Sequence, residues 1–84
     1  MKKEIDVQMY PNPARDFVKV KFDGESESKL NLEVYDVRGI KVLTQILKNG
    51  ETEIPVSALS SGAYVFKFAD EKGEMVVHKL LINR

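Results

Sequence analysis

Few side chains of this 84-residue sequence could take part in catalysis. His78 is the single histidine, and it lies between Val77 and Lys79 in an apolar segment, where a strand spacer is more common than a general base. No cysteine is present, so a thiol nucleophile, a thiolate zinc site and a disulfide are all excluded. We therefore predict that the chain is not an enzyme and that it holds no metal and no cofactor.

Acidic residues and glycines are spaced as turn residues rather than as ligands. Asp23, Asp36 and Asp70 each precede a turn, where a carboxylate usually caps nearby backbone amides, and none belongs to a calcium-loop pattern. The glycines stand singly, so they form no phosphate-binding loop, and we expect each to supply positive φ in a turn. These patterns indicate structural roles.

Composition narrows the classes of partner. Thirteen Lys and Arg residues balance thirteen Asp and Glu residues, which gives no field to attract nucleic acid. The longest apolar runs have four residues, so no membrane insertion is expected. The first residues, Met1 to Glu4, lack the apolar block of a secretory leader, and we expect any leader to lie on a longer parent protein.

Alternation of apolar and polar residues predicts strands that bury one face. The expected strands cover residues 5–9, 15–22, 29–36, 40–47, 51–55, 63–69 and 74–82. The side chains expected to face inward are Val18, Val20, Phe22, Leu30, Leu32, Val34, Tyr64, Phe66 and Phe68. Two segments, 40–47 and 75–82, are apolar on both faces; there we favour Val42 and, in the last strand, Val76, Leu80 and Ile82 as inward.

These strands predict a fold. No segment long enough for three helical turns shows a 3.6-residue period, so no helix can cover an apolar sheet face. A second sheet must do so, which predicts one all-β domain, an immunoglobulin-like antiparallel β-sandwich of about seven strands. The Tyr64 side chain is expected in its core, with the hydroxyl on a backbone acceptor.

Three short motifs occur in a fixed order. The first reads Tyr-Pro-Asn-Pro-Ala from Tyr10 to Ala14, and an alternating strand follows it. The second spans residues 34–42 and leads to residues 59–65, and the third is the basic, apolar ending from Lys79 to Arg84. Together they resemble the type A C-terminal sorting domain of the type IX, or Por, secretion system, which is found on exported proteins of Bacteroidetes.

The resemblance spans residues 10–84 and implies a C-terminal secretion signal. Residues 1–9 would be a linker from an upstream passenger domain or the first strand. Such a signal directs an attached cargo protein across the outer membrane, and a sortase-like peptidase usually removes it. The implied partners are the type IX machinery, including its outer-membrane shuttle and that peptidase, and the covalently linked cargo. The implied location is secreted or cell surface, reached through the periplasm and outer membrane.

The family's motifs place a recognition role on particular residues of this chain. These are Pro11, Asn12, Pro13, Gly39, Gly62, Tyr64, Lys79, Leu80, Leu81, Ile82 and Arg84. Each has a structural alternative: the prolines and an Asx turn at Asn12 could set the entry angle of a strand, and the glycines could serve positive φ. The terminal strand is either a handle open to edge pairing with a receptor or a solubilising strand.

A different function class fits the same fold. A fibronectin-like adhesive or carbohydrate-binding module of a secreted enzyme would also be a small β-sandwich. Sugar binding usually relies on exposed flat rings, and the sequence has no tryptophan, which leaves Tyr10 and Tyr35 as possible platforms. We therefore favour the sorting signal.

Overall fold

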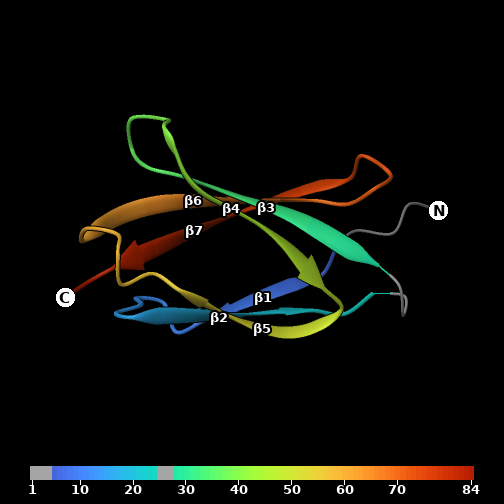
Figure 1. The fold of residues 1–84 in the computed structure, drawn as a ribbon, viewed down its shortest axis with the longest axis horizontal. Coiled ribbons are helices and arrows are strands. Elements are labelled where there is room, and N and C mark those ends of the chain that lie inside the picture. Colours follow the sequence, from blue (N-terminus) through green and yellow to red (C-terminus); the bar gives the residue numbers. More distant parts are fainter. Residues whose placement is uncertain (1–4, 25–27) are drawn as a thin grey trace.

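The computed structural model describes residues 5–24 and 28–84, which form seven strands (Figure 1). The strands are β1 Val7–Tyr10, β2 Phe17–Phe22, β3 Lys29–Tyr35, β4 Lys41–Lys48, β5 Gly50–Pro55, β6 Gly62–Ala69 and β7 Met75–Ile82. In the described ranges, no helix has the length and hydropathy that crossing a membrane requires.

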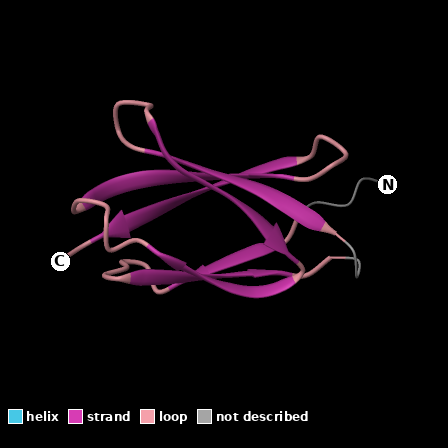
Figure 2. Ribbon diagram, in the orientation of Figure 1, coloured by secondary structure: helices cyan, strands magenta, loops and turns pink. Residues whose placement is uncertain are grey.

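The strands form two layers. One sheet has the order β1-β2-β5 and the other has the order β4-β3-β6-β7, and every pair of neighbouring strands is antiparallel. Figure 2 shows the two sheets facing each other, with no helix between or beside them among residues 5–24 and 28–84. The predicted immunoglobulin-like β-sandwich is therefore confirmed.

The core lies between the two sheets and is built by alternation along the strands. Phe66 and Phe68 of β6 are the largest fully buried side chains, with ring centroids 6.3 Å apart. The other buried core residues are Val7, Ala14, Val18, Val20, Phe22, Leu30, Leu32, Val34, Leu47, Ile54, Val56, Tyr64, Leu80 and Ile82. All inward residues predicted for β2, β3 and β6 are buried, and Val76 packs against the core beside them.

Strand β4 corrects one prediction: Val42 faces outward. Its side chain is 37% exposed, whereas Leu47 is buried and Leu43 packs against the core. The pairing of β3 with β4 shifts so that Leu43 lies opposite Val34 and Lys41 opposite Tyr35, which leaves Val42 as the extra residue of a bulge. Because opposed residues share a face, buried Val34 fixes Leu43 inward and turns Val42 away.

Two aspartates cap the turns that follow them, as the sequence predicts. Asp36 Oδ1 accepts hydrogen bonds from the amides of Arg38 and Ile40, at 2.9 and 3.1 Å. Asp70 Oδ1 accepts from the amides of residues 72 and 74, at 2.9 and 2.8 Å. The caps predicted at Asp36 and Asp70 are confirmed, and the turn after Asp23 runs into residues 25–27, which lie outside the described residues.

The glycine prediction fails at Gly24. Positive φ occurs at the glycines at positions 39, 50, 62 and 73, as expected. At Gly24 an added Cβ would lie 2.7 Å from Cζ of Phe22, so the residue is small because a core ring packs against it. The amide of Gly24 donates to Asn49 Oδ1 at 2.8 Å.

Candidate recognition site

The first and third motifs meet the start of β6 at one end of the sandwich. Because β6 and β7 are antiparallel, Gly62 lies opposite Ile82. On the other edge of β7, Ala14 forms a parallel bridge with Ile82. The chain end therefore lies between two segments that are distant in sequence, on the side marked C in Figure 1.

Asn12 bonds to β7 through its side-chain amide. Its Nδ2 donates to the Lys79 carbonyl at 3.2 Å, and its Oδ1 accepts from the Leu81 amide at 3.0 Å. The prolines on both sides of Asn12 follow cis peptide bonds and have no N–H to donate. The side chain thus replaces the peptide group that a neighbouring strand would supply. The alternative of an Asx turn at Asn12 is contradicted, because the Ala14 amide, which such a turn would bond to Asn12 Oδ1, donates to the Leu81 carbonyl.

Ala14 continues this contact through its backbone. Its amide donates to the Leu81 carbonyl at 2.8 Å, and its carbonyl accepts from the Asn83 amide at 2.9 Å. Of the two alternatives for the terminal strand, edge pairing with a receptor is therefore blocked from Lys79 to Asn83. Residues 11–14 already occupy that edge.

Arg84 closes the end of the chain through its guanidinium. Nε donates to the Arg15 carbonyl at 3.1 Å, and the two terminal nitrogens donate to the carbonyls of Leu59 and Val56. The Arg84 amide donates to Ser61 Oγ at 3.2 Å. One side chain thereby links the β1–β2 loop to the β5–β6 loop.

Tyr64 supports the same end from inside. Its side chain is 7% exposed, and its hydroxyl donates to the Ser60 carbonyl at 2.7 Å, which confirms the predicted backbone partner. This is the tyrosine corner of immunoglobulin-like folds, and it fixes the loop that precedes β6. Gly62 follows that loop with a φ of 152°.

Side chains of the last strand divide between core and solvent. Leu80 and Ile82 are 0% and 3% exposed, so the folded domain does not present them to a partner. Lys79 is exposed, and Leu81 is 52% exposed on the outer face of the sheet. Of these four predicted recognition residues, Lys79 and Leu81 are the ones that a protein partner could contact.

Gly39 lies at the same end of the four-stranded sheet as Gly62 but towards the opposite edge. It sits in the β3–β4 turn with a φ of 81°, and its amide donates to the Asp36 carbonyl at 3.0 Å. The turn belongs to the β4 side of the four-stranded sheet, whereas β7 forms the opposite edge. Arg38 contacts Asp36 at 2.8 Å, and this hydrogen bond, aided by the capped amides, holds the pKa of Asp36 below its ordinary value.

The remaining sequence candidates have structural partners. His78 is partly buried. Its ring packs edge-on against Phe68, with the ring centroids 5.9 Å apart. The hydroxyls of Tyr10 and Tyr35 contact the carboxylates of Glu51 and Glu33, and these hydrogen bonds raise the pKa of both tyrosines. Within the described ranges, no three His, Asp or Glu side chains are grouped as metal ligands.

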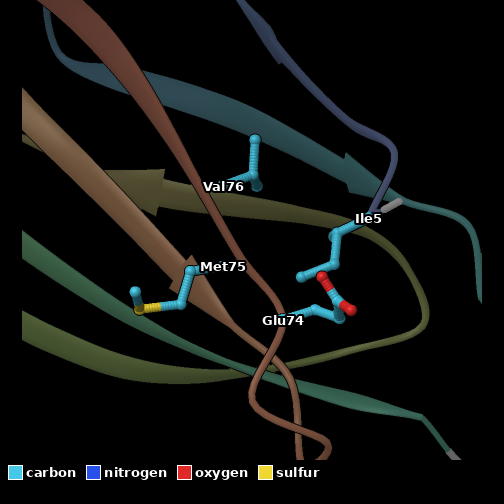
Figure 3. A pocket seen from close by; sticks show the side chains of 4 residues that line it. All are labelled: Ile5, Glu74, Met75 and Val76. Carbon is cyan, nitrogen blue, oxygen red and sulfur yellow. The ribbon is translucent and has the colours of Figure 1, made fainter. Parts of the chain in front are cut away.

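A hollow lies at the other end of β7. Ile5, Glu74, Met75 and Val76 line it, and Figure 3 shows Ile5 beside Glu74. Met75 lies opposite Ala69, at the end of β6 far from Gly62. The hollow is therefore separate from the motif residues.

Sequence reasoning missed the acceptors that complete the closed end. Ala14 is 1% exposed, and a small apolar residue directly after the proline motif was the one local sign of close packing. The carbonyls of Arg15, Val56 and Leu59 carry no sequence signal, because every residue has a carbonyl. We name the closed end, formed by Asn12, Ala14, Arg84 and the edge of residues 79–83, the clasp.

Comparison with known protein families gives a match over most of the chain. The model of a family described as the secretion system C-terminal sorting domain matches residues 8–83. No curated protein matches the chain.

Proposed function

The chain belongs to the family of secretion system C-terminal sorting domains, and we propose that the type IX machinery recognises it at the end of the sandwich that carries the clasp. As a sorting signal, the domain directs an attached cargo protein through type IX secretion across the outer membrane. The family is a signal and not a catalytic domain.

One observation carries the proposed location. Two motifs 67 to 69 residues apart in the chain are bonded to each other at one end of the domain. Two exposed side chains, Lys79 and Leu81, project from that end on the outer face of β7. A partner could bind the lysine ammonium with a carboxylate and the leucine with an apolar side chain. Such a pair of contacts would give specificity.

The finer steps follow the family. We propose that the outer-membrane shuttle binds the folded domain, that a sortase-like peptidase then removes it, and that the cargo is anchored at the surface or released. The peptidase supplies the chemistry, so this chain is its substrate. We place the connection to the cargo before Val7, because Val7 already belongs to β1; residues 1–4 lie outside the described residues.

Export of a reporter tests the function. The 84-residue chain is fused behind a signal peptide and a reporter protein in a type IX-competent bacterium. We expect the reporter outside the cell. An intact fusion that stays in the periplasm would contradict the proposal.

A lysine pair tests the location. Lys79→Ala should lower the extracellular reporter several-fold, since it removes an exposed cation beside the clasp without touching the core. Lys21→Ala is the matched control, because Lys21 is an exposed strand lysine on the other sheet. Equal export of both variants would place recognition elsewhere. Deleting residues 79–84 is less informative, because it also removes two core side chains.

A further inference from the structure

The edge of β7 that faces away from β6 differs between its two halves in hydrogen bonding. Backbone groups of a strand point alternately to its two neighbours, so the odd-numbered residues of β7 point away from β6. In the second half, the Lys79 carbonyl, both backbone groups of Leu81 and the Asn83 amide are all bonded to Asn12 or Ala14. In the first half, no hydrogen bond between described residues occupies the outward groups of Met75 and Val77.

The segment that covers the second half cannot itself be extended by another strand. Pro11 and Pro13 have no N–H, so residues 11–13 offer a new strand a single backbone donor, that of Asn12. Proteins protect sheet edges with such devices because an open edge pairs with other sheets. The sheet therefore stops at this segment.

Arg84 stabilises the end of β7 through contacts with the loops beside it. Its planar guanidinium reaches three carbonyls that belong to two loops. A lysine ammonium is a compact point charge and cannot match that fork of donors. Arg84 therefore connects the β1–β2 loop to the β5–β6 loop, although the residue is exposed to solvent.

We propose that Asn12 and Arg84 are positioning residues that hold the clasp closed, and that the type IX machinery reads the signal only in this closed state. The inference rests on the proposed function and adds the conformation that is read. The bonds of Asn12 join residues 67 and 69 positions apart. The clasp therefore forms only once both ends of the domain have folded, so a cargo with an incomplete signal is not exported.

Hydrogen exchange on the chain measures clasp opening. Asn12→Ala and Arg84→Lys should each speed exchange of the Leu81 and Asn83 amides by about tenfold, the effect of losing one or two hydrogen bonds. The Phe66 amide, in the central core, should exchange as in the wild type. Asn31→Ala and Arg38→Lys are matched controls, because both side chains lie away from the clasp.

Export of the same variants in the reporter fusion decides the proposal. We expect export to fall in proportion to the opening of the clasp while the melting temperature of each variant stays above the growth temperature. Arg84→Lys separates an effect of the positive charge from an effect of the guanidinium hydrogen bonds, because it keeps the charge and loses the fork of donors. Wild-type export of a folded Arg84→Lys variant with fast Leu81 exchange would overturn the inference, and so would increased export from an opened edge.

A milder variant covers the case in which Asn12→Ala unfolds the domain. Asn12→Asp keeps the acceptor for the Leu81 amide and loses the donor to the Lys79 carbonyl, so both exchange and export should be intermediate. If the wild-type fusion itself stays in the periplasm, the proposed function fails. If the wild type is exported and the opened variants are exported equally well, only the closed-state inference fails.

Discussion

The two halves of β7 have similar apolar sequences and different surroundings. In the first half, the inward side chains of Val76 and His78 are only partly buried, and the hollow of Figure 3 lies beside its start. In the second half, Leu80 and Ile82 are buried and the outer edge is bonded to residues 12–14. The halves thus differ on their inward face and along their outer edge, whereas Met75, Val77 and Leu81 on the outward face are exposed throughout.

This difference shows that local hydrophobicity does not decide which part of a strand is enclosed. The second half is closed by Asn12, Ala14 and Arg84, which lie outside the strand. A sorting signal needs a fold that persists until it is read and an end that does not pair with other sheets. Enclosing the terminal half meets both requirements.

The largest expected effect comes from the buried face of the second half. Leu80→Ala should lower the free energy of unfolding by about 2–5 kcal/mol, because it leaves a cavity at a side chain with no exposure. Leu81→Ala, at 52% exposure, should cost less than about 1 kcal/mol. Urea unfolding of both variants measures the difference. Equal losses would mean that the two faces of the strand are not separated as described.

The tyrosine corner should have the next largest effect. Tyr64→Phe removes the hydroxyl that bonds the Ser60 carbonyl and should cost about 1 kcal/mol. Tyr35→Phe is the matched control, since its hydroxyl bonds Glu33 on the outer face of the sheet and its loss should cost less. Thermal unfolding compares the two. A larger loss of stability in Tyr35→Phe would contradict the role given to the Tyr64 hydroxyl at the closed end.

The outward face of the first half should tolerate substitution. Val77→Thr keeps a β-branched side chain in the strand and should change the free energy of unfolding by no more than about 0.5 kcal/mol, since the side chain is mostly exposed. Exchange of the Leu81 and Asn83 amides should be unchanged. Faster exchange at those amides in this variant would show that the two halves are coupled.

The smallest effect is expected at the β3–β4 turn, which lies away from β7 and serves as a reference. The Arg38 contact lowers the pKa of Asp36 from 3.8, so the stability that the carboxylate adds is complete above that pH. It is lost as the pH falls through the lower folded value. Asp36→Asn should therefore be less stable than the wild type at neutral pH and equal to it in strong acid. Urea unfolding across pH 2–7 tests this, and a pH-independent difference would contradict it.

Sequence reasoning predicted most of the fold because strand formation and turn capping are local. Alternation identified the inward residues of β2, β3 and β6, and the carboxylates of Asp36 and Asp70 cap their turns. It failed at Val42, where a bulge in the pairing with β3 decides which face is inward. A segment that is apolar on both faces has no local signal for its orientation.

The sequence by itself determined the strands, the two-layer architecture and, through its motifs, the family. Only the tertiary structure decided what the motif residues do: Asn12 bonds to β7 and Arg84 ties two loops together. These bonds join residues that are 25 to 69 positions apart, and half of the groups involved are backbone carbonyls and amides that every residue carries. Such contacts depend on how the sheets bring distant segments together, and no local pattern of side chains encodes that.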